Sequence, residues 1–167
     1  MTDSAPVPRS EARDGYTVSS DRARLDIDAV HAYLTACYWS TGIPRETVAR
    51  AIAHSLGFGL YAPDGAQVGF ARVVTDHATF AYLCDVYVLD AHRGRGLGEW
   101  LVGFALADPA LQGLRRVILA TRDAHGLYER FGFGAPRWPD AYMDIVRPDI
   151  YRSNAGPDGA EPAPAAE

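Results

Sequence analysis

The chain has no lysine, only two cysteines and no apolar run long enough to cross a membrane. Because Cys37 and Cys84 are too few for a disulfide framework and lack the spacing of metal ligands, we expect no metal site and a reduced, cytoplasmic compartment. All sixteen basic residues are arginine and the formal net charge is −5, so we expect no binding to nucleic acid or to membranes, which requires a basic surface. Residues 1–14 contain no apolar segment of the kind that a signal peptide needs.

Apolar residues are concentrated between two polar ends, which predicts a single folded domain. The length of 167 residues is usual for one domain. Residues 1–14 contain two prolines and no apolar periodicity, and residues 151–167 are rich in glycine, proline, alanine and acidic residues, so we expect both ends to be disordered. The folded domain is then expected at residues 15–150.

Hydrophobic periodicity predicts a mixture of helices and strands. We expect strands at residues 16–19 (an edge strand), 56–61, 67–75, 79–89, 115–120 and 142–146. We expect helices that begin near Asp26, as the cap, and Pro44, and two more at residues 97–107 and 123–130. The strands between residues 56 and 89 form an antiparallel meander, whereas the strand–helix–strand order that follows predicts a parallel pair with a right-handed crossover.

The most informative stretch is residues 86–101, where a strand is followed by a glycine-rich loop and a helix. Glycine lets a backbone approach a ligand closely, and the first amides of a helix have no intrahelical acceptor and lie at the positive end of its dipole. These properties together favour a phosphate site, for which the flanking arginines are well suited. We predict that a pyrophosphate is held by the loop residues Arg93, Gly94, Arg95, Gly96, Leu97, Gly98 and Glu99.

Two other interpretations of this loop compete with the pyrophosphate site. A dinucleotide-binding fold requires G-x-G-x-x-G, whereas the spacing here is G-x-G-x-G, and no acidic residue follows about twenty positions on. The loop could instead be a turn that merely precedes a helix, without any ligand. The rest of the chain favours the ligand site.

Two motifs in order give the chain a resemblance to a known family. The segment Arg93-x-x-Gly96-x-Gly98 after a hydrophobic strand resembles the acyl-CoA pyrophosphate signature [RQ]-x-x-G-x-[GA] of the GNAT superfamily of N-acetyltransferases. That family usually continues with a strand and then A-x-x-L-Y-x-x-x-G-F, which is matched here by Ala124, Leu127, Tyr128, Gly132 and Phe133. The resemblance covers about residues 16–146, most of the chain.

The resemblance implies an α+β fold with a mixed, mostly antiparallel central sheet and helices on both faces. In that fold a splayed pair of parallel strands holds the pantetheine arm of coenzyme A. Acetyl-CoA is the implied co-substrate, with no metal. The implied reaction transfers the acetyl group to a primary amine of a small molecule by direct attack in a ternary complex.

The resemblance also assigns roles to individual residues. Tyr128 matches the tyrosine that protonates the leaving thiolate, and a phenol with an ordinary pKa of about 10 is protonated at neutral pH. The backbone of Val86, Tyr87 and Val88 is expected to hold the pantetheine and the oxyanion. Thr121 stands where many relatives have an asparagine that contacts the cofactor.

The acceptor side of the site is less well defined by the sequence. Asp85 is a carboxylate in an otherwise apolar strand, so it is a candidate general base or acceptor ligand, or else a structural partner of an arginine such as Arg72. A water chain could replace a single base. Tyr38 and Trp39, which link the first two helices, are candidate walls of the acceptor pocket or rings packed on the sheet.

Two further functions remain open at this point. A protein or peptide acetyltransferase would modify lysines or N-termini, and a non-catalytic acyl-CoA sensor would bind without transfer. The presence of Tyr128 speaks against the sensor. We expect a small-molecule amine as the partner, with a homodimer left open.

Overall fold

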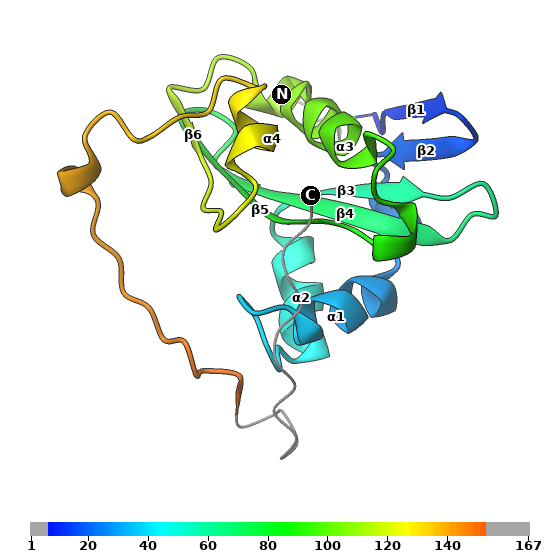
Figure 1. Ribbon diagram of the computed structural model, residues 1–167, viewed down its shortest axis with the longest axis horizontal. Helices are drawn as coiled ribbons and strands as arrows, with labels where there is room; N and C mark the ends of the chain where they lie inside the picture. Colours follow the sequence, from blue (N-terminus) through cyan, green and yellow to red (C-terminus); the bar gives the residue numbers. More distant parts are fainter. Residues whose placement is uncertain (1–6, 153–167) are drawn as a thin grey trace, which may run out of the picture.

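The computed structural model describes residues 7–152, which form one six-stranded sheet whose strands lie side by side in sequence order (Figure 1). The strands are β1 (Ser10–Arg13), β2 (Tyr16–Ser19), β3 (Leu56–Tyr61), β4 (Gln67–Thr75), β5 (Phe80–Val88) and β6 (Arg116–Ile118). The first five pair antiparallel, and β6 pairs parallel to β5. This confirms the predicted mixed, mostly antiparallel sheet.

Four α-helices cover the two faces of the sheet (Figure 1). They are α1 (Ile27–Ala36), α2 (Arg45–Ala53), α3 (Leu97–Leu106) and α4 (His125–Glu129). Asp26 caps α1 as predicted, since its carboxylate accepts from the backbone N–H of Ala29 at 3.0 Å. None of the helices in the described part of the chain is both long and apolar enough to cross a membrane.

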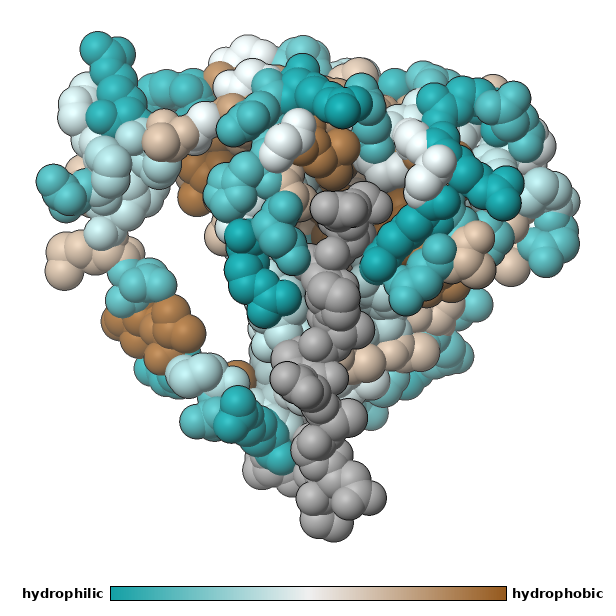
Figure 2. Space-filling view, in the orientation of Figure 1, coloured by the Kyte–Doolittle hydropathy of each residue, from teal (hydrophilic) through white to brown (hydrophobic). Residues whose placement is uncertain are grey.

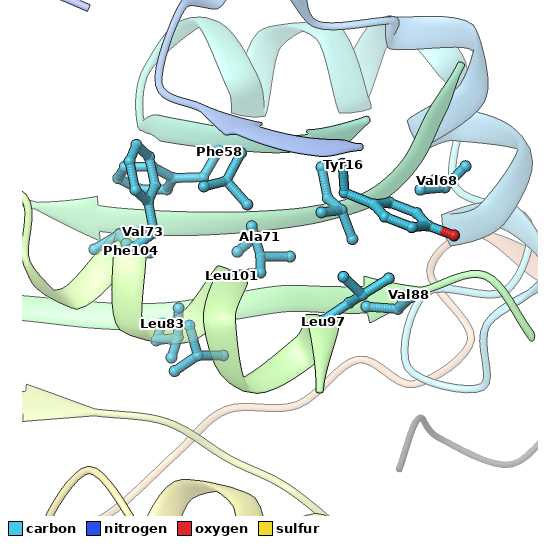
Figure 3. Close-up of a cluster of buried hydrophobic side chains, with 14 of the residues drawn as sticks. Tyr16, Phe58, Val68, Ala71, Val73, Leu83, Val88, Leu97, Leu101 and Phe104 are labelled. Carbon is cyan, nitrogen blue, oxygen red and sulfur yellow. The ribbon is translucent and has the colours of Figure 1, made fainter. Parts of the chain in front are cut away.

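Each face of the sheet has its own hydrophobic cluster. On the α3 side, Phe58, Leu101 and Phe104 belong to a large buried cluster (Figure 3). On the α1–α2 side, Phe70 and Tyr87 pack with the buried residues of these two helices. Because successive residues of a strand point to opposite faces, β4 and β5 contribute to both clusters, which makes them the fixed centre of the fold.

Strands β5 and β6 part from each other, as the resemblance implies. Their parallel pairing extends only from Phe80 opposite Arg116 to Tyr82 opposite Ile118. Further along β5 the register with β4 shifts between Phe70 and Arg72. The second half of β5 therefore presents one edge that β6 does not cover.

The unpaired edge of β5 carries the N–H of Val88, which belongs to the backbone of residues 86–88 that is expected to hold the pantetheine and the oxyanion. The N–H of Leu89 donates to the carbonyl of Val68 on β4 at 2.8 Å. Since backbone groups alternate between the two edges of a strand, the N–H of Val88 faces away from β4 and into the splay. This is the expected position for a donor to a ligand that lies between the two strands.

Three predictions for the chain ends need correction. Residues 10–13 were expected in a disordered segment, but they form β1, which makes β2 an inner strand and not an edge. All four residues of β1 are exposed, so this strand lacks the apolar pattern that would predict it. The strand expected at residues 142–146 is absent, because this segment has no sheet partner within the described chain. Residues 1–6 and 153–167 lie outside the described residues.

Candidate active site

The glycine-rich loop has the backbone geometry of an anion site. Gly94 and Gly96 have φ angles of +74° and +69°, in the left-handed region that favours glycine, and Gly96 is the N-cap of α3. The first intrahelical bond runs from the N–H of Trp100 to the carbonyl of Gly96 at 3.1 Å. The amides of Leu97, Gly98 and Glu99 in the first turn consequently have no acceptor within the helix and are available to a ligand.

The two arginines of the loop do not share one role. The guanidinium of Arg93 donates to the carbonyl of Val88 at 3.0 Å and contacts the carboxylate of Asp90 at 2.9 Å, so it braces the turn between β5 and α3. Arg95 lies between the two left-handed glycines and lines a separate hollow beside Glu11 and Trp100. The structure therefore leaves Arg95 out of the groove in which the other predicted loop residues lie.

A groove of about 870 Å³ runs from the glycine loop along the splayed strand to α4. It is lined by Val86, Tyr87, Val88, Arg93, Gly94, Gly96, Leu97, Gly98 and Glu99, and on the other side by residues of the α4 region, including Arg130. Arg130 bridges the two sides, since its guanidinium contacts the carboxylate of Glu99 at 2.6 Å. Arg130 was not predicted as a site residue, because it occupies a variable position of the second motif.

A second cavity, of about 590 Å³, lies on the other side of the splay. Its aromatic walls are Tyr38, Trp39, Tyr82, Tyr128 and Tyr151, and its charged residues are Arg72, Asp85 and Arg122. Tyr38 and Trp39 are thus brought to a cavity, as one of their two predicted roles requires. Tyr82 and Tyr151 were missed, because nothing in the local sequence distinguishes them from core tyrosines.

The carboxylate of Asp85 is hydrogen-bonded to two other residues that line the second cavity. One oxygen accepts from the guanidinium Nε of Arg72 at 2.7 Å and the other from the indole N–H of Trp39 at 3.3 Å. The ion pair with Arg72 that the sequence raised as an alternative is therefore present, with side chains only 13% and 17% exposed. Asp85 also has a φ of +53°, which costs a residue with a Cβ roughly 1–2 kcal/mol, so the backbone is strained where the carboxylate enters the site.

The aromatic pair of the α1–α2 link is held in place from both sides. The rings of Tyr38 and Trp39 meet edge to face with centroids 5.0 Å apart. The guanidinium of Arg122 lies over the ring of Tyr38 at 4.0 Å, and it contacts the carboxylate of Asp123 at a looser 3.9 Å. The loop after β6 and the α1–α2 link thereby meet across the cavity.

Tyr128 lies where the groove and the second cavity meet, since it lines both, together with Val86 and Ala124. Its ring is buried and packs edge to face on Phe133. Burial raises the pKa of the Tyr128 hydroxyl from 10.0 to about 12, with a smaller contribution from Tyr38, so the phenol keeps its proton at neutral pH.

Thr121 and the remaining titratable groups occupy other positions. The Thr121 hydroxyl caps the turn into α4, since it accepts from the N–H of Ala124 at 3.1 Å. Thr121 therefore lines the second cavity and not the groove in which the cofactor contact was predicted. Asp76 lies in the β4–β5 turn, where its carboxylate accepts hydrogen bonds from the Thr79 hydroxyl and from the amides of residues 78–80, and these bonds lower the pKa of the carboxyl. Among residues 7–152, no three His, Cys, Asp or Glu side chains group as metal ligands would.

Known proteins match both the sequence and the arrangement of these elements. The profile of the Acetyltransferase (GNAT) family matches residues 26–133. A proposed acetyltransferase of Gibberella zeae is 36% identical over an alignment of 143 positions, and the match covers 72% of this chain and 80% of that protein. The crystal structure of a proposed GNAT acetyltransferase from Xanthomonas campestris pv. campestris is 51% identical, covers 81% of this chain and 96% of that one, and superimposes with a TM-score of 0.79.

More distant structures share the fold. A proposed acetyltransferase from Deinococcus radiodurans R1 is 21% identical, covers 86% of this chain and 96% of that one, and superimposes with a TM-score of 0.64. The match to the family profile spans both motifs and both splayed strands, β5 and β6. The chain belongs to the GNAT family of acetyltransferases.

Proposed function

We propose that this protein transfers the acetyl group of acetyl-CoA to the primary amine of a small molecule, by direct attack in a ternary complex. The observation that carries the proposal is the position of Tyr128. Its side chain lines both the groove and the second cavity, which we call the acceptor cavity, and burial keeps its hydroxyl protonated. An acid at the junction of two binding spaces is suited to a reaction between their occupants.

The groove fits the chemistry of coenzyme A. The unpaired amides at the start of α3 would hold the pyrophosphate, and the N–H of Val88 in the splay would hold the thioester end. Both are backbone donors fixed by the fold, so they need little reorganisation when a ligand binds. The groove also presents Arg93 and Arg130 as positive charge toward an anionic ligand.

In the proposed reaction, Tyr128 supplies the proton for the leaving group. The uncharged amine forms a bond to the thioester carbon, the carbon–sulfur bond breaks, and the sulfur takes the proton of the Tyr128 hydroxyl. The amine gives up a proton to solvent or to a base. Tyr128 then regains its proton from water, which balances the cycle.

The acceptor cavity favours a compact amine. Its volume of about 590 Å³ falls within the usual range for small-molecule sites. The Asp85 carboxylate offers a negative group to an approaching ammonium, and the walls are largely aromatic. Since both oxygens of Asp85 already accept hydrogen bonds from Arg72 and Trp39, we assign Asp85 to holding the acceptor and the cavity wall, with water as the route for the amine proton.

The test is calorimetric titration of the protein with acetyl-CoA and with CoA, followed by a screen of small primary amines and lysine peptides with mass detection of the products. We expect micromolar binding and acetylation of a small amine. If the protein binds acetyl-CoA but acetylates only peptides, the acceptor is a peptide or protein amine and not a small molecule. If it binds acetyl-CoA without any transfer, it is an acyl-CoA sensor. Folded protein that binds neither ligand would refute the proposal.

A further inference from the structure

The charges that line the acceptor cavity do not balance. The cavity is lined by two guanidiniums, those of Arg72 and Arg122, and by one carboxylate, that of Asp85. Arg72 and Asp85 are in contact at 2.7 Å, so their charges largely offset each other. Arg122 therefore leaves a surplus of one positive charge on the cavity wall. An acceptor that carries nothing but an amine arrives as a cation, and this surplus would repel it.

Arg122 has little to bind in its own chain. Within residues 7–152, the one carboxylate within reach of its guanidinium is that of Asp123, at a distance of 3.9 Å. Asp123 lines the groove and not the acceptor cavity. No hydrogen bond from the Arg122 side chain to another described residue is present, and this side chain is 53% exposed. Its planar set of N–H donors, which suits a carboxylate, is consequently available to a ligand.

The guanidinium of Arg122 is nevertheless held at the cavity wall. It lies 4.0 Å from the ring centroid of Tyr38, and Tyr38 meets Trp39 edge to face. The indole N–H of Trp39 in turn donates to the carboxylate of Asp85. One aromatic pair thus carries the surplus positive group at one end and the negative group at the other. A cation that is held in this way loses less conformational freedom when it binds a ligand.

The wall that carries Arg122 is accessible from solvent. The loop between β6 and α4 lies on the side of the domain that faces the segment after α4 (Figure 1). The space-filling view shows open solvent between the body of the domain and this segment (Figure 2). A small polar molecule can therefore approach the loop from outside.

We propose that the acceptor is an amino acid, a compound with a carboxylate besides its primary amine, and that Arg122 binds this carboxylate. The inference rests on the proposed function and names its acceptor class. A surplus of one positive charge matches one carboxylate, whereas a phosphate monoester brings a charge of about −1.5 to −2. The carboxylate takes no part in the transfer. The nitrogen loses a proton and gains the acetyl group, the sulfur of CoA gains a proton, and the product is an N-acetyl amino acid.

The first test compares acids with their amides, which have nearly the same size but no carboxylate charge. The standard amino acids and 4-aminobutyrate are each assayed beside the corresponding amide, together with simple amines and phosphoethanolamine, at saturating acetyl-CoA. We expect the best acceptor to be an amino acid, with a kcat/KM at least about tenfold above that of its amide. Because the amine of an amino acid amide is less basic and more of it is uncharged at neutral pH, such a preference cannot come from the reactivity of the amine.

The second test is Arg122→Gln, with Arg24→Gln as the matched control. Arg24 also lies over a tyrosine ring, that of Tyr61 at 4.2 Å, but it lines neither the groove nor the acceptor cavity. We expect Arg122→Gln to lower kcat/KM by about 10- to 100-fold for the best acid and to change it little for the amide. Arg122→Lys should recover part of the preference for the acid, and Arg24→Gln should behave like wild type.

The results separate a failure of this inference from a failure of the proposed function. If simple amines, amides or phosphoethanolamine are acetylated as well as the acids, transfer to small amines stands and the amino acid class is wrong. Equal losses for acid and amide in Arg122→Gln would mean that Arg122 only holds Tyr38, which also overturns the inference. If acetyl-CoA binds and no small amine is acetylated, the proposed function fails and this inference fails with it.

Discussion

The two halves of the active site are built from different material. The groove proposed for coenzyme A has its candidate anion donors on the backbone of one short segment, residues 94–99, at the start of a helix. The acceptor cavity takes its walls from side chains of separate segments, including Trp39 on a link, Arg72 on β4 and Asp85 on β5. One half depends on the path of the chain, and the other on the identity of each side chain.

This difference predicts how each half fails. A backbone site tolerates most side-chain exchanges and is lost when the path or the charge of the loop changes. A side-chain site is altered step by step, as each exchange removes one contact. The substitutions below test this contrast, each with a matched control elsewhere in the chain.

The largest effect is expected from Gly96→Glu in the pyrophosphate loop. Gly96 has a φ of +69°, which strains any residue with a Cβ, and a carboxylate there would repel the phosphates. We expect the affinity for acetyl-CoA to fall by at least about 100-fold by calorimetry, with most of this loss arising from like-charge repulsion and distorted donors.

The control for this substitution is Gly65→Glu in the β3–β4 turn. Gly65 also has a left-handed φ, of +88°, and open space where a Cβ would be placed, so the two variants carry similar backbone strain. We expect Gly65→Glu to bind acetyl-CoA like wild type. An equal loss of affinity for acetyl-CoA in both variants would mean that general destabilisation causes the effect. The glycine-rich loop would then have no role in binding the pyrophosphate.

The next effect is expected from Tyr128→Phe at the junction of the two halves. Removal of a general acid typically costs about 100-fold or more in turnover. We expect kcat to fall by about 100-fold at saturating acetyl-CoA while the affinity for acetyl-CoA stays the same, because the ring still fills its place beside Phe133. Unchanged turnover in this variant would exclude Tyr128 from the chemistry.

Tyr61→Phe is the matched control for loss of a buried phenol. Burial raises the pKa of Tyr61 to about 12 as well, but its hydroxyl is buried without a hydrogen-bond partner in the described structure and lines neither half of the site. Since no hydrogen bond is lost, we expect stability to be unchanged or slightly higher and kcat to be unaffected.

A smaller and mixed effect is expected from Asp85→Asn. The buried guanidinium of Arg72 would lose its counter-charge while keeping one acceptor, which should lower the free energy of unfolding by roughly 1–3 kcal/mol. We expect the KM for the amine to rise about tenfold as the cavity loses its negative group, with the shape of the pH profile of kcat/KM retained. Loss of the acidic limb of that profile would instead identify Asp85 as the base.

The surface pair between Asp28 and Arg45 provides the control for Asp85. Both side chains are half exposed or more, so the pair resembles the buried one in chemistry but not in environment. We expect Asp28→Asn to leave both the free energy of unfolding and the kinetics close to those of wild type, because solvent screens an exposed ion pair.

The same contrast explains what the sequence predicted well. The glycine-rich loop is contiguous, and its glycines and helix start are local features, so its position and backbone geometry could be predicted from residues 94–99. The cap at Asp26 also depends on local chemistry. These features need no knowledge of which distant segments meet.

The acceptor half was only partly predictable, because it forms where distant segments meet. Tyr151 reaches the cavity from the far end of the chain, and Arg122 reaches Tyr38 across the molecule. The contact of Arg122 with Tyr38 and the place of Tyr151 in the cavity have no local signature in the sequence, whereas the Asp85–Arg72 pair could be raised because a carboxylate in an apolar strand needs a partner.

Strand β1 was missed because it has no apolar face, and its pairing depends on a turn at Asp14 and Gly15, both with positive φ.

The smallest effect is expected on the free energy of unfolding at alkaline pH. The acceptor cavity contains buried side chains that titrate there, including Cys84, whereas the backbone of the glycine-rich loop does not titrate. Burial raises the pKa of the Cys84 thiol from 9.0 to about 12, as it does for the Tyr128 hydroxyl. Because the unfolded chain releases these protons at lower pH than the native state, the free energy of unfolding should be constant below about pH 9 and fall as the pH rises toward 12. Burial raises the pKa of Cys37, Tyr33 and Tyr61 in the same way, so a difference between variants is the informative quantity.

Urea unfolding between about pH 8 and about pH 11 should show a shallower decline of the free energy of unfolding in Cys84→Ser than in wild type, and an unchanged decline in Gly98→Ala. Equal slopes in all three proteins would mean that the thiol of the native state is open to solvent, and that the acceptor cavity is wetter than its aromatic walls suggest.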